Sequence, residues 1–584
     1  MNPRLVILQS KHDCNEYRKN FLNRKDLIFP IGPESIYFCQ KKDLKFYHID
    51  DFISEEKNND ERKKSVFIVN KLIEKLNDYS IKISKNKLEI GNYFSFQIKI
   101  IVEQILFNIF ISKEIKEFFP DYNLLIFKNK KIKNFRVIRP DPLGLLPNVI
   151  INSQQFDSSR LKVVKIRQYF IPQSFKEKIL SILPEYIAYL LRNLRDKRRL
   201  KNSLALNTNK YRLALIGGGY DWFKFIRLPS AKNKFNIDLV NLFNKKTYYQ
   251  DKKELKIILN ILNNNIFKNN VVAYDFEDLA KYISSSFKLF QKKSNKYIRK
   301  FKRYDAVISS ILCFPEENFL AHMSTKADLP LIIWQHGEKG QSHDDTSYFT
   351  EILYSSHYLS YGKEVANQYK EWIGKNNFKM AFKVGSLQKN ITWKGKDSKS
   401  ILYATGKWQL TSNGFNDFVD PDKRLYKAHQ DILYYLNNLE NWKVTFKSNN
   451  TEYLNAVPYQ DDFRNINFNF KSSFSDLLKN TGIVILDTPA TTLIESISTE
   501  VPIFVLSGRV NYYKNFINDA KKRVVWCSTT DDLIVKLSKF INSSIYDGDV
   551  LNQTYKENYF SNYTQSQTAT TVIKKLENII NKYE

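Results

Sequence analysis

Short, uninterrupted apolar runs are the feature that most limits how this chain can fold. From about Tyr211 onward these runs alternate with segments patterned as helices. Strands that are apolar along their whole length are buried on both faces, as in a parallel sheet covered by helices. The pattern therefore predicts an α/β protein. The runs are Arg212–Ile216, Asp305–Ser310, Pro330–Gln335, His357–Gly362, Ser400–Thr405, Trp442–Ser448, Gly482–Thr488, Val501–Ser507 and Val524–Ser528.

A polar stretch without periodicity, Val384–Lys399, divides the runs into two series and is interpreted as an interdomain linker. With 584 residues the chain has room for several domains. We expect two Rossmann-like domains facing a cleft, with an enlarged N-terminal region. The predicted units are an N-terminal α/β region at 1–385 with a possible subdivision near 205, a C-terminal domain at 386–550, and a tail at 551–584 whose helix packs back across the linker.

The sequence of residues 1–200 predicts strands and helices but indicates no function for this region. Ser35–Cys39 reads as a strand. Phe94–Ser112 is strongly apolar, but Lys99 and Glu103 interrupt it, so we do not expect it to span a membrane. The opening run Met1–Gln9 is too short for a signal peptide. A cytoplasmic protein is expected.

The formal net charge of +30 favours anionic partners, such as phosphate-bearing substrates or an acidic membrane surface. Many lysines could equally well serve only to solvate the surface. The stretch Ser174–Lys201 ends in a basic run, which is either a solvated helix face or a site for lipid or polyanions. No nucleic-acid module is recognisable, so no nucleic-acid partner is expected. A peripheral position at the inner face of the cell membrane is compatible with the charge.

Metal and disulfide chemistry find no support in the sequence. The four cysteines are scattered and form no C-x-x-C pair, and no histidine spacing matches a zinc signature. The cluster around His336, His343 and Asp344 has no such spacing either. We therefore expect no metal and no cofactor.

The most informative stretch is Ile485–Leu506, ILDTPATTLIESISTEVPIFVL. A buried strand ends before Asp487, which is a candidate for donor binding at the turn that follows. Thr491 and Thr492 fall in the first turn of the next helix, where free backbone N–H groups attract phosphate. Glu495 lies about one turn further on and could accept hydrogen bonds from ribose hydroxyls. The alternative is a capped helix between two strands with Glu495 merely exposed.

A second candidate stretch is LPLIIWQHGEKGQ, in which a strand is followed at once by His336 and Gly337. Histidine can take a proton from a hydroxyl near neutral pH, and glycine lets a substrate approach the backbone. Glu338 is the competing candidate base. The alternative is a histidine at a strand end that is satisfied by a backbone carbonyl.

Loops after other strands supply further candidates for binding. Gly406 and Lys407 follow the first strand of the C-terminal series, and Lys447 ends the second strand, where its charge suits a donor phosphate. Gly218 lies in the triple-glycine loop 217–219, which could face the acceptor or the donor, and Gly337 is a candidate for approach of the acceptor. Each of these could instead be an ordinary surface turn, and no G-x-G-x-x-G motif accompanies the glycines.

The run D-T-P-A-T-T-L-I-E followed by V-P-I-F-V-L resembles the donor-binding signature of GT-B-fold glycosyltransferases. It looks closest to CDP-glycerol glycerophosphotransferases and to CMP-Kdo or CMP-sialic acid transferases, and the His-Gly loop resembles the same group. The resemblance implies that Thr491 and Thr492 hold the donor phosphate, that Glu495 binds the ribose, and that no catalytic metal is needed. A CMP- or CDP-linked donor is implied as well.

The resemblance is incomplete at one motif. Many relatives carry Lys-x-His-Pro after the second C-terminal strand, whereas this chain has TFKSNN at Thr445–Asn450, with Lys447 but neither histidine nor proline. The donor identity is therefore the weaker part of the implication.

The first hypothesis is a glycosyltransferase that moves a sugar from a nucleotide-activated donor to a surface polysaccharide or lipopolysaccharide, with a glycan or glycolipid as acceptor. A nucleotide-sugar epimerase of the same fold is the alternative within enzymes. A charge-driven nucleic-acid-binding protein is the alternative from another class, and it would show steeply salt-dependent binding.

Overall fold

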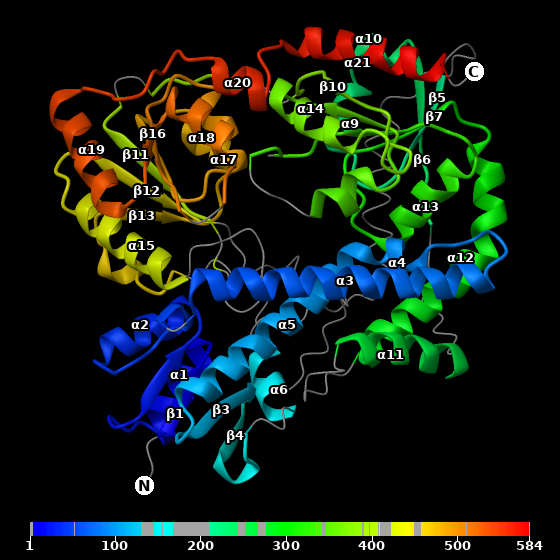
Figure 1. Ribbon diagram of the computed structural model, residues 1–584. Helices are drawn as coiled ribbons and strands as arrows, with labels where there is room; N and C mark the ends of the chain where they lie inside the picture. The colour runs from blue at the N-terminus through cyan, green and yellow to red at the C-terminus, as the bar shows by residue number, and fades with distance from the viewer. Residues whose placement is uncertain are drawn as a thin grey trace.

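Three parallel β-sheets organise the protein in a computed structural model (Figure 1). Glu338, Lys407 and the stretch Ser174–Lys201, all singled out from the sequence, lie outside the described residues. The structure describes residues 4–51, 53–129, 145–152, 156–166, 211–242, 252–266, 276–337, 339–341, 346–387, 391–395, 398–406, 408, 422–448, 457–508 and 511–582.

The first six-stranded sheet has the order β10-β9-β8-β7-β5-β6 with all neighbours parallel. Its strand order reverses around β5 and β7, and in such sheets ligands bind beyond the carboxyl ends at the reversal. The strands are β5 (Tyr211–Leu215), β6 (Phe235–Leu239), β7 (Ala306–Ser309), β8 (Leu331–Trp334), β9 (His357–Ser360) and β10 (Met380–Lys383).

The second six-stranded sheet has the order β13-β12-β11-β14-β15-β16, again with all neighbours parallel. The order reverses between β11 and β14, which is the Rossmann arrangement. The expected α/β fold with two Rossmann-like sheets is thus confirmed. The strands are β11 (Ser400–Ala404), β12 (Lys443–Lys447), β13 (Ile466–Asn469), β14 (Ile483–Leu486), β15 (Ile503–Leu506) and β16 (Val525–Cys527).

The enlarged N-terminal region carries a parallel sheet of its own, ordered β2-β1-β3-β4. The strand predicted at Ser35–Cys39 is wrong, because this segment lies in a helix, α2, with Pro33 in its first turn. Ile36 and Cys39 are both buried at a spacing of one helical turn. The strands are β1 (Arg4–Leu8), β2 (Leu27–Pro30), β3 (Asn123–Asn129) and β4 (Leu161–Ile166).

Helices cover the faces of all three sheets (Figure 1). The N-terminal ones are α1 (Lys11–Asn20), α2 (Pro33–Lys41), α3 (Glu55–Ile83), α4 (Ile90–Tyr93), α5 (Ser95–Phe118) and α6 (Leu145–Asn152). Those around the first six-stranded sheet are α9 (Tyr220–Phe225), α10 (Pro229–Lys232), α11 (Lys252–Ile266), α12 (Glu277–Phe301), α13 (Pro315–Thr325) and α14 (Lys363–Tyr369). The rest are α15 (Asp422–Asn437), α16 (Phe474–Leu478), α17 (Thr491–Ile497), α18 (Lys514–Lys521), α19 (Thr530–Ser543), α20 (Thr554–Tyr559) and α21 (Gln565–Ile580).

Helix α5 contains the apolar stretch Phe94–Ser112, for which the sequence predicted no membrane span because of its charges. The structure gives a different reason for the same expectation. The helix is long and apolar enough to cross a membrane despite Lys99 and Glu103. However, 83% of its apolar window is buried inside the protein. Lys99 and Glu103 are buried as well, and their charged atoms pair at 2.6 Å. The helix is therefore part of the protein core.

The N-terminal unit contacts both six-stranded sheets. Ile36 of α2 packs into the apolar cluster of the second sheet, and Lys41 forms an ion pair of 2.9 Å with Asp462 there. A second ion pair has the charges the other way round, with Lys423 of α15 pairing with Asp51 of the N-terminal unit. On its other side the unit shares an apolar cluster with the first sheet through α3, α4 and α5.

The C-terminal helix α21 lies against the first six-stranded sheet rather than the second (Figure 1). Leu576 is fully buried in the cluster that also contains Leu213 and Leu215 of β5. Tyr211 at the start of β5 donates a hydrogen bond of 3.0 Å from its hydroxyl to Asn581. The end of the chain is therefore a structural part of the N-terminal half.

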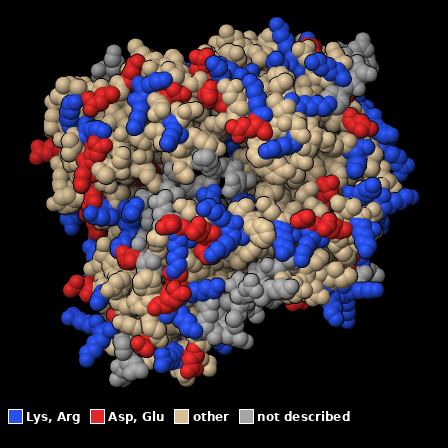
Figure 2. Space-filling model, in the orientation of Figure 1, with Lys and Arg blue, Asp and Glu red and all other residues tan. Residues whose placement is uncertain are grey.

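Basic and acidic side chains are mixed over most of the face seen in Figure 2. Basic ones predominate along its right-hand edge, where Figure 1 places α12. On this face of the molecule the positive charge is therefore unevenly distributed.

We predict that Leu576→Ala lowers the free energy of unfolding by about 2–5 kcal/mol, the range for truncating a fully buried leucine. Urea unfolding of the full-length protein measures the change. Val535→Ala on α19 is the control, because Val535 is 66% exposed and its truncation should have little effect. If the two variants had the same urea midpoint of unfolding, α21 would not stabilise the first sheet.

Candidate functional site

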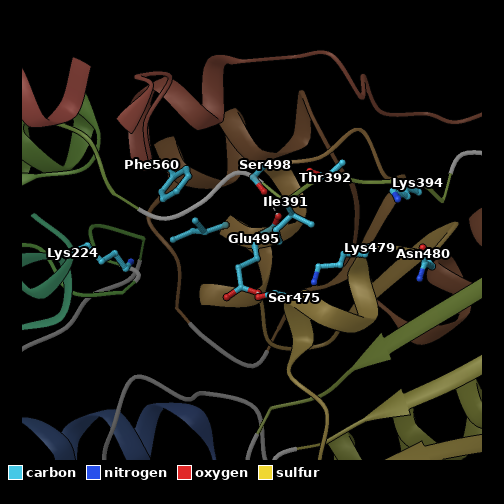
Figure 3. Close-up of a pocket in the computed structure, with 11 residues that line it drawn as sticks. Lys224, Ile391, Thr392, Lys394, Ser475, Lys479, Asn480, Glu495, Ser498 and Phe560 are labelled. Atoms are coloured by element: carbon cyan, nitrogen blue, oxygen red, sulfur yellow. Dashed lines mark hydrogen bonds between the residues drawn. The ribbon is translucent and has the colours of Figure 1, made fainter. Parts of the chain in front are cut away.

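A cavity of about 800 Å³ lies between the two six-stranded sheets and is lined from both sides. In Figure 3, Glu495 and Ser475 point toward one another, with Lys224 and Phe560 on one side and Lys479 on the other. The lining residues are Lys224 of α9, Ile391, Thr392 and Lys394 of the linker, Ser475, Lys479 and Asn480 in and after α16, Ile494, Glu495 and Ser498 in and after α17, and Phe560.

Among the described residues that line this cavity, Glu495 is the acidic one. Its carboxylate accepts a hydrogen bond of 2.7 Å from the Ser475 hydroxyl. Burial raises the pKa of Glu495, and the hydrogen bond from Ser475 offsets part of that rise. A carboxylate held this way can accept further hydrogen bonds from a ligand hydroxyl in the cavity.

His336 follows β8 and is half-buried. Its ring stacks on the ring of Tyr220, with a centroid distance of 3.4 Å and an interplanar angle of 17°. Tyr220 is the first residue of α9, and Lys224 lies one helical turn further along the same helix. The helix that carries the stacking partner of His336 therefore also lines the cavity.

The His-Gly loop and α17 lie next to one another across the two sheets. Gly337 has φ of 67°, a conformation that favours glycine, and a Cβ placed on it would lie 3.7 Å from Thr491 Oγ1. Thr491 begins α17, and Glu495 lies one turn later. Thr492 follows in the same first turn. The two stretches singled out from the sequence are thus brought together.

Asp487 sits at the reversal of strand order in the second sheet and is almost fully buried. Its Oδ1 accepts hydrogen bonds from the Gly406 N–H at 2.9 Å and from the Thr488 hydroxyl at 3.1 Å. Its Oδ2 accepts one from the Tyr403 hydroxyl at 3.0 Å and lies 2.9 Å from His429 Nε2. Asp487 therefore ties the loop after β11 to the loop after β14, and its predicted role in donor binding stays a prediction.

The other C-terminal candidates lie at the same edge of the sheet. A Cβ on Gly406 would come 2.3 Å from Thr488 Oγ1, so the loop can approach so closely only with glycine there. The Lys447 ammonium donates a hydrogen bond of 2.7 Å to the Ser448 carbonyl, and burial lowers the pKa of Lys447. Both contacts are internal, and the donor roles predicted for these residues stay predictions.

Gly218 is part of a backbone bridge at the reversal of the first sheet. Its N–H donates to the Ile311 carbonyl at 3.2 Å, and its carbonyl accepts from the Ser310 N–H at 2.8 Å. The loops after β5 and β7 are thereby joined. A direct contact between Gly218 and the acceptor stays a prediction.

Sequence reasoning missed the residues that support the site across long distances in the chain. Tyr220 follows directly on the triple-glycine loop, and an aromatic residue at that place was the available signal in the sequence. In the structure it is 49% exposed. Ser475 and His429 carry no local signal, because each is defined by a partner on another element.

Within the described parts of the chain, no group of three or more histidine, cysteine, aspartate or glutamate side chains could hold a metal ion.

A family model for LIC12162 family transferases matches residues 145–516. The chain belongs to this family of transferases. The family assignment confirms the transferase class expected from the sequence. The name of this family mentions none of the cytidine-nucleotide families that the motifs resemble. The predicted similarity to those families therefore stays a prediction. No curated protein matches this transferase in sequence.

Several solved structures are similar to this transferase at low identity. UDP-GlcNAc 2-epimerase from Neisseria meningitidis bound to UDP-GlcNAc is 12% identical, with a TM-score of 0.37 over 63% of this chain and 100% of that one. Acinetobacter baumannii MurG is 11% identical, with a TM-score of 0.36 over 63% and 99%. The apo lipopolysaccharide outer core galactosyltransferase WaaB is 14% identical, with a TM-score of 0.36 over 62% and 99%.

We predict that Glu495→Gln raises the melting temperature of the unliganded transferase at neutral pH. The raised pKa means that ionised Glu495 is disfavoured in the folded state, so the neutral amide removes that penalty. As pH falls below about 4.3, the carboxyl is protonated in the unfolded state too, and the difference should vanish. Glu500→Gln, at an exposed position just beyond α17, is the control for loss of one negative charge. A gain that is the same at every pH would contradict this account.

Proposed function

We propose that this transferase is a glycosyltransferase that moves a sugar from a nucleotide-activated donor to an acceptor hydroxyl of a surface polysaccharide or lipopolysaccharide. The observation that carries the proposal is the place of Glu495. Its carboxylate faces a cavity between two Rossmann-like sheets, on the helix whose first residue lies against the His336–Gly337 loop. The family assignment supports transfer chemistry.

The cavity suits a nucleotide. Glu495 would accept hydrogen bonds from the two ribose hydroxyls, and Ser475 would keep its carboxylate oriented. Three lysines on the cavity wall, Lys224, Lys394 and Lys479, would balance the phosphate charge. Thr491 and Thr492 would add hydroxyl and backbone donors on the side nearest to Gly337.

His336 would act as the base on the acceptor. Its imidazole would take the proton of the acceptor hydroxyl while that oxygen forms a bond to the anomeric carbon and the bond from that carbon to the donor phosphate breaks. Stacking on Tyr220 would hold the ring in place. Glu338, two residues further on, is the alternative base.

Three finer points belong to the proposal. The resemblance of the motif around Thr491 supports a CMP- or CDP-linked donor. Balance of the phosphate charge by lysines, Lys407 and Lys447 included, would make a catalytic metal unnecessary. The basic surface supports a peripheral position at the cytoplasmic face of a membrane that carries the acceptor.

We predict that nucleotides raise the melting temperature of the protein by mass action and that Glu495→Ala weakens this binding about 10- to 100-fold. A panel of CMP, CDP, UDP, GDP and ADP, titrated by thermal shift, measures both effects. Glu500→Ala is the matched control, because it removes a carboxylate near α17 that does not line the cavity. Equal affinities for the two variants would exclude Glu495 as the ribose ligand, and no shift with any nucleotide would reject a nucleotide donor.

We predict further that His336→Asn lowers the rate of sugar transfer about 10²- to 10⁴-fold, the range for loss of a general base. Nucleotide affinity should stay within about twofold, because His336 does not line the cavity. The assay pairs a radiolabelled donor with membrane glycan extracts. Undiminished transfer by the folded variant would point to Glu338. Formation of an altered nucleotide sugar from donor alone would favour an epimerase instead.

A further inference from the structure

The solvent face of α12 is strongly basic. From Leu279 to Tyr304 the sequence contains nine lysines and arginines and no aspartate or glutamate. Lys292, Lys296 and Arg299 are exposed and, at spacings of four and three, lie on one face of the helix. The opposite face is buried in the core through Phe287 and Phe290, so the basic face is held in a fixed orientation.

The end of α3 adds exposed aliphatic side chains beside this basic face. Ile81 is 37% exposed and Ile83 is 48% exposed, with exposed Lys82 between them. The amide of Asn86, just after α3, donates to Ser294 Oγ at 2.5 Å and to Asn295 Oδ1 at 2.9 Å, which fixes the end of α3 against α12. Figure 1 shows the two helices meeting there at the right of the molecule.

We define the α3–α12 surface as Ile81, Lys82, Ile83, Lys292, Lys296 and Arg299. Asn295, to which Asn86 is bonded, lies between Lys292 and Lys296 on the same helical face. The end of α3, which carries the isoleucines, and the basic face of α12 therefore lie side by side. In the orientation of Figure 2, lysine and arginine predominate at this edge.

We propose that the α3–α12 surface docks on a membrane that contains anionic lipids. The cations would lie among the lipid phosphates, and the two isoleucines would enter the boundary between headgroups and acyl chains. Exposed aliphatic side chains next to a basic helix face match such an interface. A polynucleotide offers phosphate charge without an apolar phase for the isoleucines, so it is the less suitable partner. This inference does not depend on the proposed sugar transfer.

The experiment is co-sedimentation of the full-length protein with phosphatidylcholine vesicles, with and without phosphatidylglycerol. We expect binding only to vesicles that contain phosphatidylglycerol, and weaker binding at higher salt. Lys292→Glu, Lys296→Glu and Arg299→Glu together should weaken partitioning at least about 100-fold. Ile81→Ser with Ile83→Ser, which changes no charge, should weaken it roughly tenfold.

Lys427→Glu, Lys443→Glu and Lys521→Glu together form the matched control, because these lysines are exposed on the second six-stranded sheet and its helices. This triple variant should retain binding within about threefold. All variants should keep the nucleotide-induced thermal shift of the unaltered protein, which separates this test from that of the catalytic proposal.

Three results would overturn the docking surface: no binding to phosphatidylglycerol vesicles, equal losses in both triple variants, or unchanged binding in the isoleucine variant. In the last case, competition by duplex DNA at equal phosphate concentration would identify a general polyanion surface instead.

Discussion

The buried carboxylate of Asp487 is the interaction on which the architecture of the C-terminal half depends. A parallel sheet brings the loops after neighbouring strands to one edge, but it does not fix their conformation. Asp487 does so by accepting hydrogen bonds from Tyr403, Gly406 and Thr488 and by lying beside His429. The first six-stranded sheet achieves the same result with backbone alone, through the bridge between Gly218 and Ile311. In each case the join is made where the strand order reverses.

The features of the fold that could be predicted from the sequence are those with a repeated pattern, above all the strands. Buried parallel strands are apolar throughout, so runs such as Gly482–Thr488 could be located and ordered in two series, and the candidate residues after them share the expected edges. The prediction failed where the pattern is ambiguous. The short apolar run Ser35–Cys39 fits a strand or one face of a helix, and Pro33 in the first turn favours the helix that forms. Phe94–Ser112 was judged by its charges, which the fold buries as a pair.

Much of the candidate site could not be predicted, because it consists of contacts between elements. The stacking of His336 on Tyr220 and the hydrogen bond from Ser475 to Glu495 each join residues from different loops or helices. No local pattern specifies such a pair, since the positions depend on how α9, α16 and α17 pack. Asp487 shows a further use of a position at a strand end, because its carboxylate holds the loops after β11 and β14 together. A strand-end residue can hold a loop as well as a substrate.

The N-terminal unit changes how the cleft can move. Its contacts with both six-stranded sheets, through α2 on one side and α3 to α5 on the other, turn the three sheets into a closed ring. Two lobes joined by one linker can swing apart freely, but in a ring each pair of neighbours limits the third. Widening of the cavity beside Glu495 would therefore strain the contact of the N-terminal unit with the second sheet or its packing against the first. The ion pairs there are partly exposed and each is worth little, so the buried packing of Ile36 is the stronger limit on how wide the mouth of the cleft can become.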